Sequence, residues 1–234
     1  MKLNEHTAVS TAHALLVPYD HRHVLTYHAW MEDPAIQEAT ASEPLTLEEE
    51  YENQESWRAS HDKLTFIICQ PIPKLSTSTP SIEAGEYDSP SQMIGDVNLF
   101  LYPDENDDEI PLNNPKFCIG EVDIMLASSQ HRGKGLGKEV IKGFLKYVWE
   151  HREQIMREYA EDKDIVPPPG LKMIMAKVSE KNENSLSLFE RKLGFEREGE
   201  VNYFGEVKLV LRDLGGFVAR ESVDGYKEVK YLRE

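Results

Sequence analysis

The sequence contains little cysteine, with two residues in a chain of 234. Cys69 and Cys118 each lie in an apolar, strand-like run, so we expect both to be buried, reduced thiols. Clustered histidines are missing, and the two cysteines do not have the spacing of a metal site. We therefore expect neither a disulfide framework nor a bound metal.

Positive charge is also scarce. Lys and Arg together number 26 against 42 Asp and Glu, which gives a formal net charge of -16. Nucleic acid is therefore not expected as the main partner, because its phosphates would be repelled. An acidic surface attracts cationic substrates such as amines, although the same charge could serve solubility alone.

Long hydrophobic runs are the third absence. No apolar run follows Met1 and Lys2, and no apolar stretch reaches the roughly 18 residues of a membrane-spanning helix. We expect a soluble, intracellular monomer without a membrane partner, in the cytoplasm and with the nucleus as a second location. The length and the 40% hydrophobic content suit one globular domain with a sizeable core.

Hydrophobic periodicity predicts an α/β (α+β) chain in the order β-α-α-β-β-β-α-β-α-β-β. The predicted strands are 14–19, 64–69, 93–101, 117–127 and 171–178, with two more inside 196–212. The predicted helices cover about 20–33, 46–57, 135–159 and 182–193.

We assign residues 1–213 to one domain with mobile insertions near 71–92 and 102–116. Residues 214–234 form a C-terminal extension that folds back or stays mobile.

Several helix ends carry local signals. Thr46 and Glu49 form a capping box, in which a hydroxyl and a carboxylate satisfy backbone N–H groups reciprocally. Gly194 is expected to close the last helix. His21 and His23 are expected to face solvent where the first helix begins.

The segment from Arg132 to Lys138 places three glycines where a strand gives way to a long helix. Glycine permits positive φ and close approach of the backbone to a ligand. The first turn of a helix presents unpaired N–H groups and a partial positive charge. Together these features favour a phosphate cradle. A glycine-rich turn without a ligand is the alternative.

Two familiar phosphate-binding loops do not fit this segment. A Walker A loop needs Ser or Thr after its Gly-Lys pair, where Glu139 stands here. A Rossmann fingerprint needs a final glycine at a position that Lys138 or Val140 occupies, depending on the starting glycine.

Polar residues interrupt the two strands before this loop. Ile94, Asp96, Asn98 and Phe100 are expected on one face of 93–101, because side chains alternate along a strand. Glu121 and Asp123 share a face of the next strand. Acids on an otherwise apolar strand are unexpected in a core, which makes both of them candidate site residues.

The pattern Arg132-x-x-Gly135-x-Gly137, in this order of elements, resembles the pyrophosphate loop of the GNAT acetyltransferase superfamily. Asn182-x-x-Ser185 followed by Leu193-Gly194-Phe195 resembles the RimJ/RimL-like branch, with one extra residue that we place near Lys192. The stretches 41–48, 95–100 and 132–137 are similar to the eukaryotic N-acetyltransferase-nine-like proteins.

This resemblance implies the GNAT fold, with a mixed, mostly antiparallel sheet of seven strands flanked by helices. It also implies that the chain transfers an acetyl group from acetyl-CoA to an amine, expected to belong to a protein or peptide. The residues that it implies for the cofactor are Met125, Leu126, Ala127, Arg132, Gly133, Lys134, Gly135, Leu136, Gly137, Lys138, Asn182, Ser185 and Phe189. Asn182 could instead serve only as a helix N-cap.

Acetyl transfer also requires a neutral amine and help for the leaving thiolate. Glu121 is our first choice as general base, with Asp123 or a water held by Asn98 as alternatives. Glu43 is expected in the substrate groove. Many relatives carry a proton-donating tyrosine where this chain has Phe189, so Tyr203 or a water is expected as the acid. Two other functions remain open: binding acetyl-CoA to act by contact with a partner protein, and acetylating small amines such as polyamines.

Overall fold

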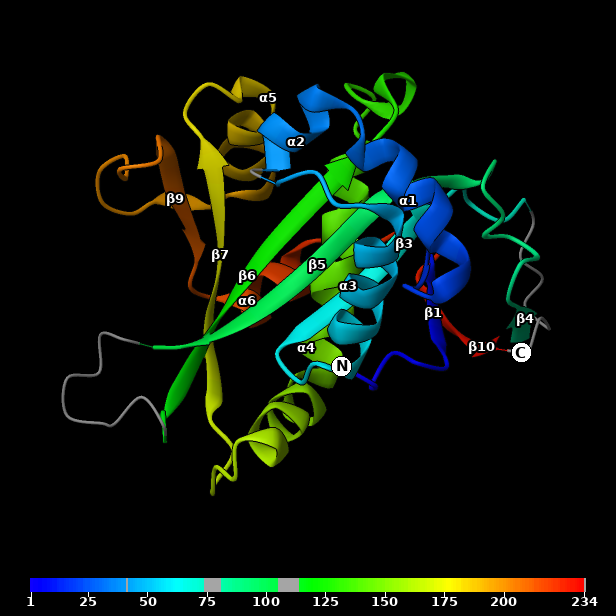
Figure 1. Ribbon diagram of the computed structural model, residues 1–234. Coiled ribbons are helices and arrows are strands. Elements are labelled where there is room, and N and C mark those ends of the chain that lie inside the picture. The colour runs from blue at the N-terminus through cyan, green and yellow to red at the C-terminus, as the bar shows by residue number, and fades with distance from the viewer. Residues whose placement is uncertain (41, 74–80, 105–113, 234) are drawn as a thin grey trace.

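The computed structural model describes residues 1–40, 42–73, 81–104 and 114–233. The strands of these residues form one sheet, in the order β4-β10-β1-β2-β3-β5-β6-β7-β9-β8 (Figure 1). Their bounds are β1 Thr7–Ser10, β2 Leu15–Pro18, β3 Lys63–Cys69, β4 Ser81–Glu83, β5 Met93–Pro103, β6 Phe117–Leu126, β7 Gly170–Ser179, β8 Glu196–Arg197, β9 Glu206–Leu211 and β10 Lys227–Leu232.

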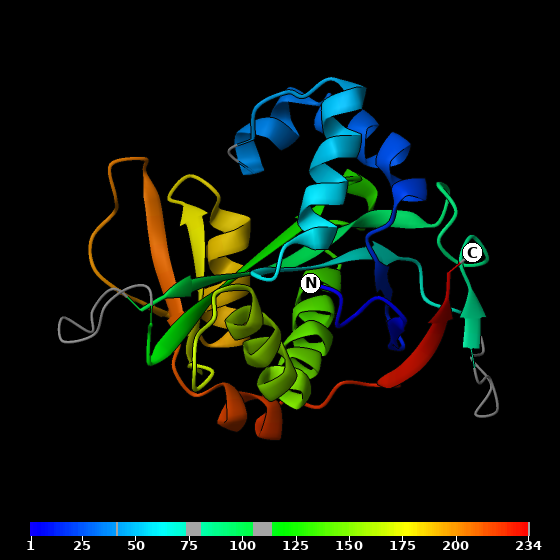
Figure 2. The same cartoon turned by 60° about the horizontal axis from the view of Figure 1, so that its bottom comes forward.

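Helices cover both faces of this sheet (Figure 2). The α-helices are α1 Val24–Met31, α2 Pro34–Thr40, α3 Leu47–Ala59, α4 Leu136–Asp162, α5 Glu183–Leu186 and α6 Leu214–Arg220. Helices α1 to α3 lie on one face, and α4 and α6 lie on the other. Within the described residues, no helix combines the length and the apolar character needed to cross a membrane.

The main core lies between the sheet and α4. Phe66 of β3 meets Phe144 and Tyr147 of α4 edge-on, with ring centroids 6.1 and 5.3 Å apart. Val97 and Leu99 of β5 belong to the same buried cluster. Because strand side chains alternate, Asp96 and Asn98 must point to the opposite face, beneath α1 to α3.

The sheet is mixed and mostly antiparallel, as expected, but it has more than the seven strands predicted. Only the β6–β7 and β10–β4 pairs are parallel among the described strands. Three strands at one edge were missed, namely β1, β4 and β10. Each is short, from three to six residues, so its hydrophobic alternation gives a weak signal.

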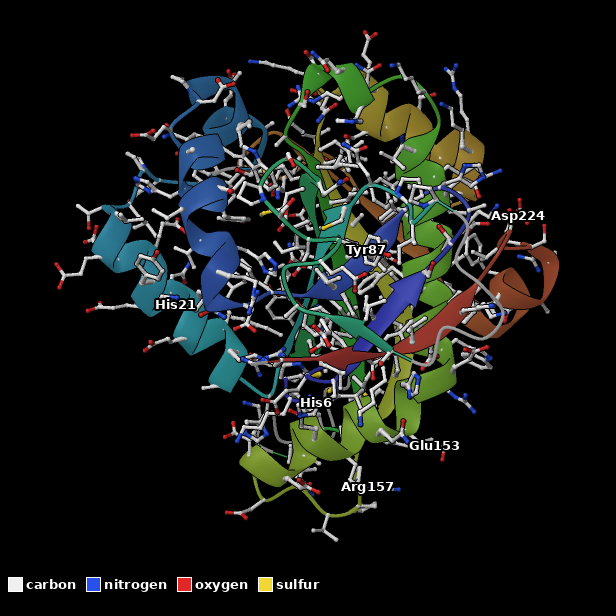
Figure 3. The ribbon with its side chains drawn as sticks, turned by 90° about the vertical axis from the view of Figure 1, so that its right-hand side faces the viewer. His6, His21, Tyr87, Glu153, Arg157 and Asp224 are labelled. Atoms are coloured by element: carbon white, nitrogen blue, oxygen red, sulfur yellow. The ribbon has the colours of Figure 1, made fainter. Side chains whose placement is uncertain are left out.

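The C-terminal segment folds back onto the sheet. Strand β10 pairs with β1 in antiparallel fashion and with β4 in parallel, and Figure 3 looks onto this edge. The residues after 213 therefore complete the sheet of the domain instead of forming an extension outside it.

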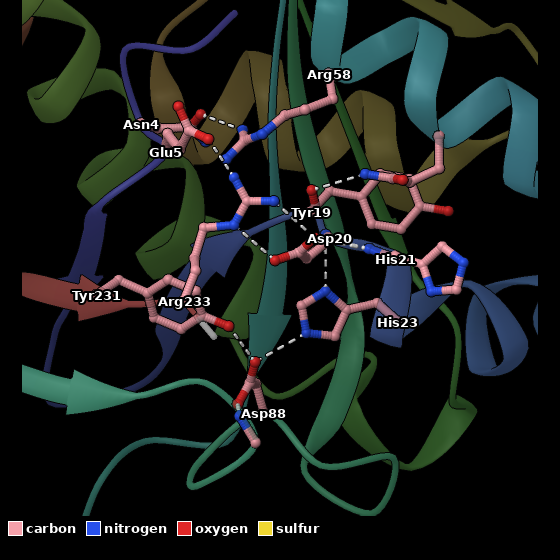
Figure 4. A network of polar contacts seen from close by, with 12 residues as sticks. Asn4, Glu5, Tyr19, Asp20, His21, His23, Arg58, Asp88, Tyr231 and Arg233 are labelled. Atoms are coloured by element: carbon pink, nitrogen blue, oxygen red, sulfur yellow. Dashed lines mark hydrogen bonds and ion pairs between the residues drawn. The ribbon is translucent and has the colours of Figure 1, made fainter.

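The expectation of a mobile insertion at 71–92 is wrong for residues 81–92. Asp88 is buried and accepts hydrogen bonds from His23 and Tyr231, at 2.9 and 2.6 Å (Figure 4). Residues 74–80 lie outside the described residues. In the second proposed insertion, residues 102 and 103 extend β5, and 105–113 also lie outside the described residues.

His23 is fully buried, so the expectation that it faces solvent is wrong. Its Nδ1 accepts the backbone N–H of Asp20 at 3.0 Å, which leaves Nε2 to donate to Asp88. Arg233 donates to both carboxylate oxygens of Asp20, at 2.8 and 2.9 Å (Figure 4). These contacts tie the C-terminal strand and the 81–92 segment to the turn that starts α1.

Two helix signals were interpreted correctly, and two α-helices, α2 and α6, were missed. Thr46 and Glu49 form the predicted capping box at the start of α3. Gly194 has a φ of +74° at the end of the helix predicted at 182–193, just after the helical segment Ser187–Lys192. Helix α2 was missed because Pro34 was taken as a stop, whereas proline is well tolerated in the first turn of a helix.

The extra residue expected near Lys192 is accommodated inside the helix itself. Residues Ser187–Lys192 form a π-helix, whose wider turn holds one residue more than an α-helical turn.

Candidate active site

Strands β6 and β7 run side by side and then separate (Figure 1). Their last paired residues are Glu121 and Met175. Beyond this point β6 stays paired with β5, and β7 stays paired with β9. The rest of β6 therefore presents a strand edge to the opening, which we call the split.

The peptide groups of β6 alternate along this edge. The N–H of Ala127 donates to the Ile94 carbonyl at 2.9 Å, so odd-numbered residues of β6 turn their peptide groups toward β5. The peptide groups of Ile124 and Leu126 face the split. Met125 and Ala127, expected to act through their backbone, are thus oriented toward β5.

Arg132 holds the chain where it leaves β6. Its Nε donates to the Leu126 carbonyl at 2.7 Å, and one terminal nitrogen donates to the Ala127 carbonyl at 2.9 Å. These bonds occupy much of the guanidinium fork. Arg132 therefore positions the loop. The sequence suggested that its guanidinium would bind a phosphate, but in the structure it binds backbone carbonyls.

Two glycines shape the turn into α4. Gly133 has a φ of +74° and Gly135 a φ of +85°, and an added Cβ would meet nothing within 4 Å at either residue. Backbone conformation, more than lack of space, therefore requires glycine here. Gly135 is the N-cap of a 27-residue helix and has no side chain to bond the first-turn N–H groups. These groups are left to bind an anion.

The other residues of the loop have mixed surroundings. A Cβ on Gly137 would lie 3.2 Å from Leu188, so this glycine lets α4 pack against the π-helix. Leu136 packs against the core, and Lys134 is exposed. Lys138 lies 3.8 Å from the carboxylate of Glu221.

The second sequence landmark begins α5. Asn182 is the N-cap, and its side-chain oxygen accepts the N–H of Ser185 at 3.1 Å. The capping alternative is therefore realised, and the amide nitrogen is not needed for it. Phe189 is 3% exposed and packs edge-on against Phe195, so it lies in the core and not on a cofactor-facing surface.

Three polar residues meet on the face of the sheet beneath α1 to α3, and we call them the acidic face: Asp96, Asn98 and Asp123. Asn98 and Asp123 are direct partners across β5 and β6. The Nδ2 of Asn98 donates to Oδ2 of Asp96 at 2.7 Å. Asp96 and Asn98 are each 2% exposed, whereas Asp123 is exposed and accepts the N–H of Ile124 at 2.8 Å.

One residue of β5 departs from the expected alternation. Ile94 was expected to share a face with Asp96, but it packs in the main core with Val97. The register between β3 and β5 shifts at this point, since Ile68 pairs with Gly95 while Cys69 pairs with Met93. A bulge of this kind turns one side chain to the other face.

Burial and like charge disturb the two carboxyls. Burial raises the pKa of Asp96 to about 7, and the negative charge of Asp123 adds to this effect against the hydrogen bonds from Asn98 and Tyr27. The pKa of Asp123 is raised as well, because protein crowds the carboxyl although the residue reaches solvent, and the hydrogen bond from Ile124 opposes this effect. Carboxyls that share one site cannot both ionise freely.

The helix side of the site supplies two tyrosines and a glutamate. Burial raises the pKa of Tyr27 far above its ordinary value, and the nearby carboxyls, Asp96 first among them, add to this effect. The rings of Tyr19 and Tyr27 lie 5.2 Å apart. Tyr27 of α1 thus stands among the acids of the sheet and Glu50 of α3.

Glu121, our first choice as base, is already engaged. Lys177 of β7 donates to its carboxylate at 2.9 Å. The pair bridges β6 and β7 where they begin to separate. Because the carboxylate is engaged across the two strands, its position favours a bracing role.

Two further predicted residues lie on exposed connections. Tyr203 is 96% exposed in the turn before β9, with its ring against Phe204. Glu43 is exposed between α2 and α3. The hydrogen bonds of the acidic face involve neither of them.

Sequence reasoning missed Asp96 and Tyr27 as site residues. The signal for Asp96 was present, because a carboxylate within the run Ile94–Leu101 is as unexpected as the acids of β6. Tyr27 carried no comparable signal, since a tyrosine on a helix usually belongs to the core.

A strand edge that opens beside a glycine-lined helix start, with a buried acid on the next strand, is the arrangement of an acyltransferase that uses coenzyme A. Residues 13–196 match the acetyltransferase (GNAT) domain family. The chain belongs to the GNAT acetyltransferase family. It is an acetyltransferase, and acetyl-CoA is its co-substrate.

Relatives from several eukaryotes extend over most of the chain. An N-acetyltransferase 9-like protein of Caenorhabditis briggsae is 39% identical over 90% of this chain and 88% of its own length. Human alpha/beta-tubulin-N-acetyltransferase 9 is 36% identical over 90% of this chain and 86% of its own.

Solved structures share the fold at low sequence identity. The aminoglycoside acetyltransferase AAC(6')-Ib, crystallised with coenzyme A, has a TM-score of 0.57 and 16% identity, over 92% of this chain and 99% of its own. A spermidine N-acetyltransferase chimera of SpeG from Vibrio cholerae and hSSAT has a TM-score of 0.59 and 16% identity, over 89% and 100%.

Proposed function

We propose that the chain transfers the acetyl group of acetyl-CoA to an amine of a protein or peptide. The observation that carries this proposal is the position of the acidic face, which runs from Asp123 on β6, the strand that borders the split, to Asp96 on the neighbouring strand β5. Asp123 is open to solvent beside buried Asp96, so a cationic amine arriving at β6 meets negative charge.

The cofactor side of the proposal rests on backbone groups. When bound, acetyl-CoA supplies an activated thioester. The edge of β6 would hold its pantetheine arm by strand-like pairing through the Ile124 carbonyl and the Leu126 N–H, since the Ile124 N–H bonds to Asp123 and the Leu126 carbonyl to Arg132. The first-turn N–H groups of α4, beside Gly133 and Gly135, would hold its diphosphate. Asn182 stands beyond the end of β7 and would contact the same arm through its free amide nitrogen.

A macromolecular acceptor is favoured over a small amine by what surrounds the split. The turn before β9 carries the exposed aromatic side chains of Tyr203 and Phe204, and it lies next to the end of β7, where the N–H of Glu180 donates to the Gly205 carbonyl. Exposed aromatic side chains are typical of protein-binding surfaces. The names of the fly and human relatives, alpha/beta-tubulin-N-acetyltransferase 9, also support a protein substrate.

The test is an acetyl-transfer assay with purified protein, acetyl-CoA and three sets of acceptors. The acceptors are peptides with free N-termini, including those of α- and β-tubulin, peptides with internal lysines and blocked N-termini, and polyamines. We expect turnover with one of the peptide sets, detected by mass spectrometry as acetylation of the acceptor.

Other outcomes would redirect the assignment. Turnover with polyamines alone would make the chain a small-amine acetyltransferase. Tight binding of acetyl-CoA without transfer to any acceptor would indicate a protein that acts by contact.

A further inference from the structure

We infer that Asp96 is the proton acceptor for the attacking amine, with Asn98 and Asp123 as the residues that position and tune it. This inference rests on the proposed function, because it assigns a role within the same acetyl transfer. It replaces Glu121, the residue that the sequence favoured.

The first observation is a free oxygen in a buried place. Asp96 is 2% exposed, and its Oδ2 accepts from Asn98. Its Oδ1 has no partner at hydrogen-bond geometry, although the Tyr27 hydroxyl lies close enough to the carboxyl to lower its pKa. A buried carboxylate oxygen without a partner is costly, so a structural carboxylate would normally be fully bonded. An oxygen left open in this way suits a group that bonds to a substrate.

The second observation is that other unpartnered oxygens surround it. The buried side-chain oxygens without a partner on this side of the sheet are Tyr19 Oη, Glu50 Oε2, Thr65 Oγ1 and Asn98 Oδ1. Thr65 is the partner of Asn98 across β3 and β5. The carboxylate and amide oxygens of this set can only accept, so they match a ligand rich in N–H donors, as an amine is.

The third observation is access. Asp123 is the direct neighbour of Asn98 and is exposed, so the acidic face runs from solvent to buried Asp96. Met125, the partner of Asp96 across the strands, packs with Met31 and Ile36 of α1 and α2. These apolar side chains limit water above the carboxylate on this side.

Every charged or titratable group near Asp96 comes from a neighbouring element. Asp123 faces it from β6, Tyr27 from α1, Tyr19 from the segment before α1, and Glu50 from α3. The two carboxyls are acidic, the two tyrosines stay neutral because their pKa values are raised, and His28 lies near Glu50. The surroundings hold the pKa of Asp96 at about 7, close to the value that suits a general base at neutral pH.

The chemical step is balanced without any further reactant. The amine nitrogen forms a bond to the acetyl carbon, the carbon–sulfur bond breaks, and the sulfur leaves with the electron pair. The proton lost by nitrogen passes to Oδ1 of Asp96. It then goes to the thiolate or to solvent, which restores the carboxylate for the next cycle.

The first experiment replaces Asp96 by asparagine, which keeps the shape and can still accept from Asn98. We expect kcat to fall by about 100-fold to 10,000-fold, the usual effect of removing a general base. The thermal shift caused by acetyl-CoA should stay as in the unmodified protein. Asp213→Asn is the matched control, since this exposed N-cap of α6 accepts from Gly216 on the far side of the sheet and asparagine caps equally well.

A second experiment leaves Asp96 in place and measures the pH dependence of kcat/KM, so it does not depend on whether the Asp96 variant folds. The rising limb of kcat/KM against pH should follow the ionisation of Asp96. Asn98→Ala removes a hydrogen bond that lowers the pKa of Asp96, so the limb should move to higher pH. Asp123→Asn removes a negative charge that raises this pKa, so the limb should move to lower pH, each by about half a unit or more.

Two results would overturn the assignment while leaving the proposed function intact. One is an Asp96→Asn enzyme that keeps kcat within a few-fold of the original. The other is a pH limb that stays in place in both the Asn98 and Asp123 variants. A protein that transfers acetyl to no acceptor at all would overturn the assignment and the proposed function together.

Discussion

The guanidinium of Arg132 donates to the backbone carbonyl of Leu126 at 2.7 Å, across the turn between β6 and α4. This contact joins the two backbone elements that bind acetyl-CoA in our proposal, the split edge of β6 and the glycine turn. The sequence suggested Arg132 as a phosphate ligand, but its side chain instead fixes the backbone geometry of the site.

Arg132→Lys should weaken acetyl-CoA binding, because the strand edge and the glycine turn would no longer be held together. An ammonium cannot reproduce the two diverging bonds of a guanidinium, so we expect the Kd for acetyl-CoA to rise by about tenfold, or roughly 1.4 kcal/mol. Isothermal titration calorimetry measures this. Arg157→Lys on the exposed side of α4 is the control. An unchanged Kd would show that the hydrogen bonds of Arg132 to the Leu126 and Ala127 carbonyls are not needed for acetyl-CoA binding.

Gly135→Glu should abolish the rise in melting temperature that acetyl-CoA produces. The new carboxylate would stand at the N–H groups meant for the diphosphate, and a ligand that no longer binds the folded state no longer stabilises it. Gly199→Glu is a matched control, because Gly199 also has positive φ and open space for a Cβ. Both variants carry the same backbone strain, so we expect only Gly135→Glu to lose the rise in melting temperature caused by acetyl-CoA. A full thermal shift in folded Gly135→Glu would exclude the anion site at α4.

Asp96→Asn should stabilise the protein at alkaline pH. The pKa of Asp96 is about 7 in the folded protein against an ordinary 3.8, so the folded state binds this proton more tightly than the unfolded chain. Its contribution to stability therefore falls as pH rises from about 4 to about 7 and stays low above that. The full difference corresponds to about 4 kcal/mol as an upper bound.

Chemical denaturation at pH 5 and pH 8 measures this effect. The gain in unfolding free energy from Asp96→Asn should be larger at pH 8 than at pH 5. An equal change at both pH values would mean that Asp96 titrates near its ordinary pKa, which would also weaken its assignment as the base.

Glu121→Gln should lower activity only modestly, by less than about tenfold, and should leave the pH limb in place. Its carboxylate is paired with Lys177 at 2.9 Å, and such partly exposed pairs contribute about 1 kcal/mol or less. Lys177→Met should have a similar small effect, and the double variant should lose little more, since both act through one contact. A hundredfold loss of kcat together with a lost pH limb in Glu121→Gln would restore Glu121 as the base.

The sequence by itself determined the elements whose signals are local. The strand 117–127, the long helix after the glycine turn and the capping box at Thr46 all depend on neighbours within a few residues, so periodicity and capping rules predicted them. The glycines at 133 and 135 were recognisable for the same reason, because positive φ is a property of single residues.

Only the tertiary structure decided which polar residues act together. Asn98 meets Asp123 because of the register between β5 and β6, and Glu121 meets Lys177 because β7 follows β6 in parallel. The pKa of Asp96 depends on burial beneath α1 to α3 and on a charge 27 positions later in the chain. Burial and charge act through space, so the spacing of residues in the chain cannot reveal them, whereas backbone geometry acts along the chain and can be predicted from it.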